Sequence, residues 1–522
     1  MTRDLRAAHR RARRRTLRGY TPLVVGLGLV AAMVVVVPSR VPDEIANAGD
    51  IAAAEVPTGQ TASGWGEGVA PCPDRERQVD TDGYAPPCFR WDGGDNGGAT
   101  SRGVTEDEIT VSYRLTQDPN ALALIAQLAG MPIDETNEDL LRTAEGLIDY
   151  FNQNFQFYGR RLVLEGYEGR GSLVEELYGA GQEAATNDAL RVVDEIGAFA
   201  DVTALTQPYA DALARNQVLS FGVPYMSQEW FNDRRPYAWS STPDCTNVSQ
   251  MASQFANQHL MGRPARWAGG DLAGRPRKLA IIAPNNLEYQ QCVDAGLEVL
   301  EEAGNRIALR RDYVLDLGQT DAQAPALVAA LKANEITSVS FAGDPLMLMA
   351  LTREAEAQDY HPEWLVIGVG FVDTDLAGQM ISAGAPNQWR RAFGGSPLAA
   401  QASPGTSPAY RAYRSVRDDE PSLLVDIVYH QLLPLALGVQ MAGPELTPET
   451  FETGLFAYPG GTGMAGTWDW RPGNYTPVVD IREIWWDPDR PSPFNGAPGT
   501  YVDNGERYRL DEIPEGEPEV FQ

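Results

Sequence analysis

Residues 103–113 read GVTEDEITVSY and open a region in which strand-like and helix-like segments alternate as far as residue 373. The apolar run at 109–115 predicts a buried strand. The helix predicted at 137–154 has apolar residues at spacings of three and four, namely Leu140, Ala144, Leu147, Ile148, Phe151 and Phe155. The strands that follow are predicted at 161–167, 197–202 and 218–223. A repeated strand–helix unit predicts a parallel sheet covered by helices.

The same pattern begins again after a polar stretch at 239–244. Its strands are predicted at 278–283, 306–314, 337–342 and 365–369. Two successive units of similar size imply an α/β protein with two lobes. Beyond residue 373 the pattern is less regular, with an apolar helix predicted at 422–441 and a strand at 478–486. The acidic tail at 514–522 is expected to be disordered.

The length and charge of the chain limit what it can be. A chain of 522 residues is too long for one compact core and predicts two or three domains. The formal net charge is −29, but residues 1–40 hold nine arginines and one aspartate, so residues 41–522 carry −37. A surface this acidic repels phosphate backbones, and no nucleic-acid partner is expected.

A membrane anchor is predicted near the N-terminus. Residues 19–39 contain no charge and, at about 1.5 Å per residue, would extend roughly 31 Å as a helix, enough to cross a bilayer. Eight arginines precede them, which predicts a cytoplasmic tail at 1–19, a transmembrane helix at 20–39 and an extracellular remainder. The alternative is a cleaved signal peptide, for which Ala46-Asn47-Ala48 has the required small residues.

Residues 40–100 are rich in Gly, Pro, Ala and Asp and are predicted to form an extracellular linker. The four cysteines allow three pairings. We favour Cys72–Cys88, a short loop worth about 3 kcal/mol in the chain-entropy model, and with it Cys245–Cys292. There is no Cys-x-x-Cys, and the four histidines are scattered, so neither a metal nor another cofactor is expected.

The opening run resembles the mature start of type I solute-binding proteins, the branched-chain amino-acid receptor family of ABC importers, whose first strand follows a Gly-Val-Thr-Asp-Xaa-Glu-Ile turn. The segment Gly466-Thr467-Trp468-Asp469 resembles the family's last crossing between lobes. The resemblance covers roughly 103–513, within a solute-binding domain predicted at 101–513. It implies two parallel-sheet α/β lobes with a hinge, the type I periplasmic-binding-protein-like fold.

The resemblance also implies where each lobe begins and ends. It places the first crossing near residues 240–244 and the second around 364–371. The first lobe would then comprise about 103–240 and 365–460, and the second about 241–364 and 461–513. In such a fold the ligand lies between the lobes, where strand ends meet.

Four residues of the first lobe are candidates for ligand contacts. Thr116 and Asp118 follow the first strand, where the family usually has Pro-Leu-Ser-Gly and this chain has Leu-Thr-Gln-Asp. Thr203 and Thr206 lie in a segment that resembles the one whose hydroxyls and backbone N–H groups hold a ligand carboxylate. The alternative interpretation is structural: the first two residues would form a turn, and a threonine would cap a helix.

Further candidates wall the predicted cleft, three from the second lobe and one, Tyr225, from the first. Asn286 and Tyr289 follow the strand at 278–283, and the family has an aromatic residue near this point. Asp344 follows the strand at 337–342, where amino-acid receptors carry an acidic group for the ligand ammonium. Tyr225 follows the fourth strand. The alternatives are a helix start at Asp344-Pro345 and ordinary packing for the aromatic residues.

The sequence contains no Gly-x-Ser-x-Gly, His-Glu-x-x-His or Gly-x-x-x-x-Gly-Lys motif, and an enzyme is not expected. The resemblance instead implies a membrane-anchored extracellular protein that captures a small polar ligand, an amino acid or a related molecule, for an ABC permease. We also hypothesise that Thr203 and Asp344 hold opposite ends of a zwitterionic ligand. The alternatives are a sensory ligand-binding protein and a cell-envelope assembly protein with a degenerate cleft.

Overall fold

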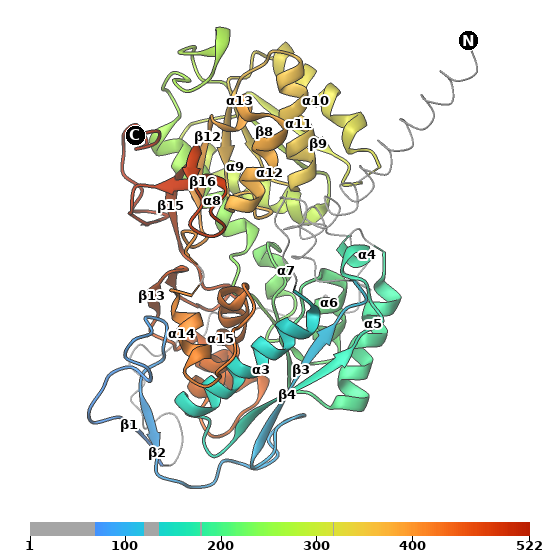
Figure 1. Cartoon of the computed structure of the whole chain (residues 1–522), viewed down its shortest axis with the longest axis vertical. Helices are drawn as coiled ribbons and strands as arrows, with labels where there is room; N and C mark the ends of the chain where they lie inside the picture. The colour runs from blue at the N-terminus through green and yellow to red at the C-terminus, as the bar shows by residue number, and fades with distance from the viewer. Residues whose placement is uncertain (1–67, 119–134, 178–179, 317, 404) are drawn as a thin grey trace, which may run out of the picture.

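The computed structural model describes residues 68–118, 135–177, 180–316, 318–403 and 405–522, which form two lobes stacked along the long axis of the molecule (Figure 1). The sheet of the first lobe is parallel, with the order β4-β3-β5-β6-β7. Its strands are β3 Glu108–Leu115, β4 Arg161–Glu168, β5 Ala200–Asp201, β6 Leu219–Phe221 and β7 Ala238–Trp239.

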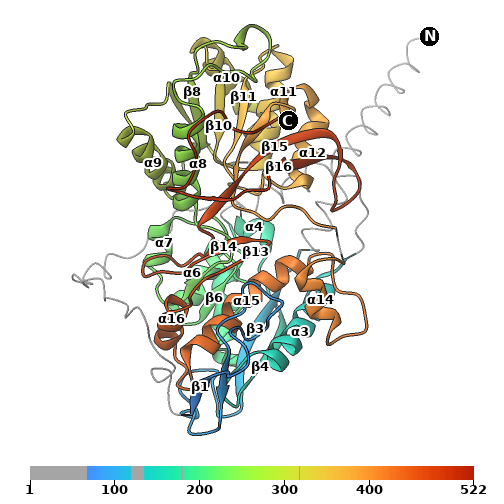
Figure 2. The ribbon, with the colours of Figure 1, turned by 90° about the vertical axis from the view of Figure 1, so that its left-hand side faces the viewer.

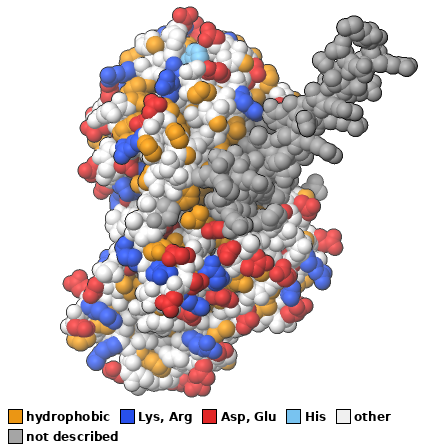
Figure 3. All heavy atoms as spheres, viewed as in Figure 1, with side chains coloured by type: hydrophobic (Ala, Val, Ile, Leu, Met, Phe, Trp, Pro, Cys, Tyr) orange, Lys and Arg blue, Asp and Glu red, His pale blue; other side chains and the backbone are white. Residues whose placement is uncertain are grey.

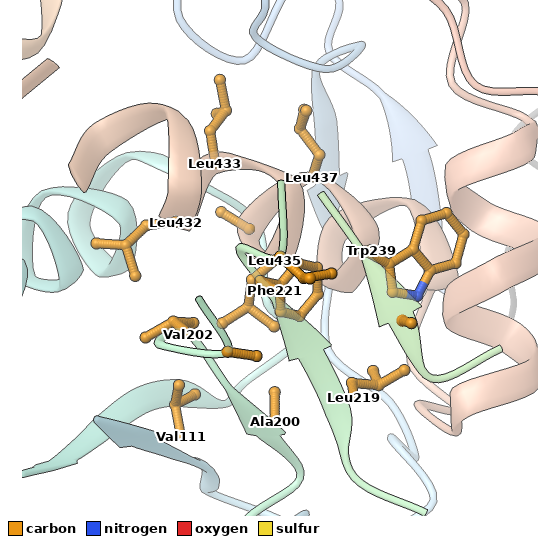
Figure 4. Close-up of a cluster of buried hydrophobic side chains, with 14 of the residues drawn as sticks. Val111, Ala200, Val202, Leu219, Phe221, Trp239, Leu432, Leu433, Leu435 and Leu437 are labelled. Atoms are coloured by element: carbon orange, nitrogen blue, oxygen red, sulfur yellow. The ribbon is translucent and has the colours of Figure 1, made fainter. Parts of the chain in front are cut away.

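Helices from two distant parts of the sequence cover this first sheet. Those of the first part are α3 Asn137–Asn154, α4 Leu173–Leu177, α5 Gln182–Arg191, α6 Gln207–Arg215 and α7 Gln228–Asn232. Those of the second part are α14 Pro408–Arg414, α15 Val425–Ala442 and α16 Pro448–Phe456. Figure 4 shows leucines of α15 lying over Val202, Phe221 and Trp239, so this late helix completes the core of the first lobe.

The second lobe contains a larger, mixed sheet with the order β16-β15-β12-β11-β10-β8-β9, and β17 pairs with β15. Its parallel strands are β8 Leu279–Pro284, β9 Leu309–Tyr313, β10 Ser338–Phe341, β11 Glu363–Val366 and β12 Ala392–Ser396. Its antiparallel strands are β15 Asp480–Pro491, β16 Pro498–Asp503 and β17 Tyr508–Arg509.

The two faces of the second sheet carry different helices. One face packs against α8 Cys245–His259 and α9 Leu287–Glu302, and the other against α10 Thr320–Ala333, α11 Pro345–Ala357, α12 Asp375–Gly384 and α13 Pro386–Trp389. In β8, Leu279 packs on the face covered by α8 and α9, whereas Ala280 and Ile282 pack on the face covered by α10 to α13. This alternation is the period of two that a strand imposes on its side chains.

The chain passes between the lobes three times: between β7 and α8, between β12 and α14, and between β14 (Gly466–Trp468) and β15. The second crossing differs from our prediction. Residues 365–396, which we assigned to the first lobe, form part of β11 and all of α12, α13 and β12 in the second. The periodicity of an apolar strand does not reveal which sheet it joins, and this is why the boundary was placed too early.

The third crossing also differs from the predicted boundary at 461. The hairpin of β13 (Gly461–Gly463) and β14 lies with the first lobe, since the ring of Trp468 lies 5.7 Å from that of His430 on α15. The second lobe resumes at β15. Arg482 and Arg507 donate to the carbonyl oxygen of Leu398 over 3.0 and 3.1 Å, which ties the start of the second crossing to the second-lobe segment that follows the third.

The described part of the predicted linker, residues 68–100, is folded. The strands β1 Val69–Pro71 and β2 Phe89–Trp91 form a hairpin beside the Cys72–Cys88 disulfide. Tyr84 is buried, and its hydroxyl donates to the Gly466 carbonyl over 2.7 Å. The linker prediction was therefore wrong for these residues, because a few aromatic side chains in a Gly- and Pro-rich segment are enough to anchor it.

The acidic tail is ordered as well. The ring of Phe521 lies 5.8 Å from that of Phe393, and His259 Nδ1 lies 3.0 Å from the carbonyl oxygen of Gly516. The expectation of disorder was wrong because the apolar residues among the acidic ones bury against the second lobe.

Both disulfides match the favoured pairing, with Cα–Cα distances of 5.4 Å for Cys72–Cys88 and 5.5 Å for Cys245–Cys292. The transmembrane helix predicted at 20–39 lies outside the described residues. Within the part of the chain that the structure describes, no helix combines the length and apolarity needed to cross a bilayer. Figure 3 shows acidic and basic side chains mixed over the visible face of both lobes.

Candidate functional site

The candidate site of the first lobe lies at the carboxyl ends of its parallel strands. Figures 1 and 2 both place α4 and α7 at the edge of this lobe that faces the second lobe. Arg114, the penultimate residue of β3, and Asp201, the last residue of β5, are buried there. Ligands of parallel α/β sheets bind at such strand ends.

Arg114 is the centre of a buried charge cluster. Its Nη1 donates to Glu176 Oε2 over 3.0 Å, and its Nη2 donates to the other oxygen of the same carboxylate. Its Nε donates to Asp188 Oδ2 over 2.8 Å, and its guanidinium lies 4.2 Å from the centre of the Tyr209 ring. Burial alone would lower the pKa of Arg114, but hydrogen bonds and charges, chiefly from Glu176, raise it above its ordinary value.

Thr206 joins this cluster from the start of α6. Its side-chain hydroxyl donates to Glu176 Oε2 over 2.5 Å and makes no capping hydrogen bond to the helix. Its side chain therefore binds a carboxylate of the chain itself. The predicted contact of Thr206 with a ligand carboxylate remains a prediction.

Thr203 belongs to a second buried network, centred on Asp201. The backbone N–H and the hydroxyl of Thr203 both donate to Asp201 Oδ1 over 2.8 Å. Ser112 and Tyr209 donate to Asp201 Oδ2 over 2.6 and 2.9 Å. Burial raises the pKa of Asp201, although each of these hydrogen bonds acts to lower it. Thr203 thus supports the end of the sheet.

Thr116 and Asp118, two further candidates of the first lobe, occupy a turn. Asp118 Oδ1 accepts from the Ser172 hydroxyl over 3.0 Å. The Asn137 side-chain amide donates to the carbonyl oxygens of Asp118 and Thr116 over 2.9 and 3.4 Å. These contacts fit the turn-forming alternative, since they join the end of β3 to the starts of α3 and α4.

In the second lobe, Asp344 starts α11. Its Oδ1 accepts from the Met347 N–H over 2.9 Å, and its Oδ2 accepts from the Tyr313 hydroxyl over 2.5 Å. Burial raises the pKa of this carboxyl group. Both oxygens are thus engaged inside the lobe, as the helix-start alternative predicts. Among the described residues, no hydrogen bond joins Asp344 to Thr203.

Asn286 and Tyr289 lie at the start of α9, beside β8. Asn286 is the N-cap residue and is partly exposed, whereas Tyr289 is buried with its side chain in the cluster that spans both lobes. Burial and the charge of Asp344 raise the pKa of Tyr289 well above its ordinary value.

Tyr225 connects the lobes. Its ring lies 5.0 Å from that of Phe371, edge to face, and packs against the Cys245–Cys292 disulfide. Burial, followed by the charge of Asp373, raises the pKa of Tyr225 well above its ordinary value. Tyr225 follows β6 in the first lobe and Phe371 follows β11 in the second, so this contact crosses the interface.

Polar contacts that the sequence did not predict also cross the interface. Gln207 Nε2 donates to Glu288 Oε1 over 3.3 Å, joining α6 to α9. The Ser227 hydroxyl donates to Gln291 Oε1 over 2.8 Å, and Gln291 Nε2 donates to Glu229 Oε2 over 2.6 Å, joining α7 to α9. The only sequence signal for these contacts is a polar residue beside the first turn of a helix that follows a strand. This pattern is too common to identify interface residues.

A cavity of about 40 Å³ lies inside the second lobe, between the sheet and the helices α8 and α9. It is lined by α8, α9 and the strands beneath them, including Phe255, Leu279 and Val293. In the described part of the chain, no group of three His, Cys, Asp or Glu side chains could hold a metal ion.

The sequence matches the model of a known protein family over most of its length. Residues 121–484 match the family model described as periplasmic binding protein. The match covers more than half of the 522 residues, and the chain belongs to this family. No curated protein matches the sequence.

Solved structures support the same fold. A leucine-, isoleucine-, valine-, threonine- and alanine-binding protein from Brucella ovis is 12% identical, with a TM-score of 0.53, covering 79% of this chain and 98% of its own. A solute-binding protein from R. palustris in complex with 4-hydroxybenzoate is 12% identical, with a TM-score of 0.52, covering 77% and 97%. A fatty acid ABC transporter substrate-binding protein from Thermomonospora curvata is 13% identical, with a TM-score of 0.51, covering 81% and 99%.

Proposed function

We propose that this chain is the solute-binding component of an ABC-type importer and that it holds a small polar solute between its two lobes. The observation that carries the proposal is membership of the periplasmic binding protein family over residues 121–484, together with two lobes joined by three crossings. Chains linked in this way can close on a ligand and exclude water, which strengthens polar contacts.

The solute would contact both lobes. On the first lobe we propose Thr116, Asp118, Thr203, Thr206 and Tyr225, at or beyond the ends of β3, β5 and β6. On the second lobe we propose Asn286, Tyr289 and Asp344, beyond β8 and β10. An amino acid or another small carboxylate would suit this mixture of hydroxyl, amide and aromatic groups.

We also propose that residues 20–39 anchor the protein in the cell membrane, with the lobes outside and a permease as partner. Support comes from the uncharged run at 19–39 and from the arginines before it. An anchored receptor stays near the permease without free diffusion.

A thermal-shift screen of the purified full chain tests the function. The panel should contain amino acids, hydroxybenzoates and fatty acids, with calorimetry for each compound that raises the Tm. Asn286→Ala should lower the affinity for the solute by about 2- to 13-fold, which corresponds to the loss of one neutral hydrogen bond. Asn334→Ala, at the opposite edge of the second sheet, is the control. A solute whose affinity both variants leave unchanged would argue against this site.

A second candidate is an envelope assembly protein that uses the fold without a solute. It is favoured by one observation: Arg114, Thr206 and Thr203 are satisfied by the chain's own carboxylates. A panel that produces no binding, together with co-purification of envelope proteins, would favour this alternative.

A further inference from the structure

Glu176 has an unusual set of partners. In the described chain its side-chain carboxylate accepts from the guanidinium of Arg114 and the hydroxyl of Thr206, which reach it from β3 and α6. The side chain of Glu176 is 0% exposed, and that of Arg114 is 1% exposed. Glu176 itself stands on α4, a helix of only five residues at the edge of the lobe.

Asp188, the other acid beside Arg114, is bound differently. Its carboxylate accepts from the backbone N–H groups of Arg170 and Gly171, over 2.8 to 2.9 Å, as well as from Arg114. Asp188 is thus fixed by the main chain and balances the charge of Arg114. Glu176 adds a second negative charge that the cluster does not need for neutrality.

The residues around the Glu176 carboxylate leave room for a carboxylate and direct donors at it. A Cβ atom at Gly171 would lie 2.1 Å from Glu176 Oε1 and 1.7 Å from Arg114 Nη2, so only glycine permits this approach. Two guanidinium nitrogens and one hydroxyl converge on two oxygens. This is the planar, two-pronged geometry with which arginine recognises a carboxylate.

We propose that Arg114, Thr206 and Gly171 form a carboxylate-binding site in the first lobe, that Glu176 fills it as an internal ligand, and that a carboxylate of the solute binds there by exchanging with Glu176. The exchange conserves charge, because one carboxylate replaces another beside Arg114. Binding would therefore be coupled to displacement of α4. The part that concerns the solute rests on the proposed function, whereas the site itself does not.

Chemical rescue tests the site without any knowledge of the solute. Glu176→Ala removes the internal carboxylate and leaves room for a small one. The Tm of this variant should be below that of the wild-type full chain and should rise with increasing sodium acetate, because a ligand that binds only the folded state stabilises it. Sodium chloride at equal ionic strength and neutral acetamide should not reproduce the rise.

Two variants serve as controls. Glu176→Gln keeps the side-chain volume, so its Tm should not respond to acetate. Glu195→Ala breaks an exposed ion pair with Arg191 in the same lobe, so a general effect of acetate on a missing glutamate would show there. An equal acetate response in Glu195→Ala, or no specific response in Glu176→Ala, would overturn the proposal.

Failure to fold is also informative. If Glu176→Ala is recovered folded only when acetate is present, the site is supported, and if acetate does not help, the proposal is refuted. If acetate rescues Glu176→Ala but no compound of the thermal-shift panel binds, the carboxylate site is supported and the proposed transport function is not. A carboxylate solute that binds Glu176→Ala and wild type equally would contradict the exchange.

Discussion

Removing the side-chain hydrogen bonds between α7 and α9 should weaken the contact between the two lobes. Gln291 makes two hydrogen bonds across the interface, one with the Ser227 hydroxyl and one with the Glu229 carboxylate. A neutral hydrogen bond contributes about 0.5–1.5 kcal/mol, and one to a charged group about 1.5–3 kcal/mol. Glu229 is exposed and water screens its charge, so its bond is discounted to about 0.5–1 kcal/mol, as for exposed charged pairs.

The combined loss for Gln291→Ala is then about 1–2.5 kcal/mol, which shifts the ratio of joined to separated lobes by about 5- to 70-fold. Amide hydrogen exchange of α7 and the first half of α9 measures this shift, since opening exposes their amides. Exchange there should accelerate in Gln291→Ala, while that of β8 and β10 should stay unchanged.

Gln290→Ala is the matched control. Gln290 is the neighbouring residue of α9, but its side chain donates to Pro284 and Asp312 within the second lobe. Faster exchange of α7 in both variants, or in neither, would refute the view that Gln291 holds the lobes together.

Asp373→Asn should stabilise the protein increasingly as the pH rises. Burial raises the pKa of Asp373 above its ordinary 3.8, so the folded state holds the proton more tightly; the stability this gives is present below that value and is lost as the pH rises through the folded pKa. Urea unfolding at pH 4 and pH 8 should show a larger gain at pH 8, and equal effects at both would contradict this. Gly171→Ala should lower the free energy of unfolding, because its Cβ would overlap Arg114 and Gly171 does not have the positive φ that would strain an alanine. Urea unfolding that gives the same free energy for the variant and the wild type would argue against the close approach. Protease treatment of intact cells should digest the lobes and spare a fragment containing residues 1–39, and release of the whole chain from the membrane by salt would contradict the anchor.

Much of the fold could be predicted from periodicity. The apolar spacing of α3 and the buried run of β8 each specify an element, because burial of one face imposes a period of 3.6 or 2. The alternation of these elements predicted two parallel sheets, and the second sheet differs in adding the antiparallel strands β15, β16 and β17. Both disulfides were predicted by loop length and neighbourhood.

Periodicity could not predict which strands and helices pack against one another. β11 and β12 join the second sheet and α15 returns to the first, and those contacts are formed by residues far apart in the sequence. The folding of residues 68–100 depends on single long-range contacts such as that of Tyr84 with Gly466. Local composition carries no signal for them.

The site was only partly predictable. The threonines at strand ends were named as candidates because their position in an α/β unit is generic, and their contacts with a ligand remain a prediction. Arg114 was overlooked, although a charged residue within an otherwise buried strand signals a buried partner. Glu176 could not have been matched to it, since 62 residues separate the two and only the folded structure brings them together.

The measurement that tests the central claim most directly is the distance between the lobes with and without solute. Spin labels can be placed at Leu190→Cys in the first lobe and Val314→Cys in the second, because both positions are exposed and the four native cysteines are paired. A solute that binds between the lobes should shift and narrow the distance distribution measured by electron resonance. A solute that calorimetry shows to be bound while the distribution stays the same would contradict the account.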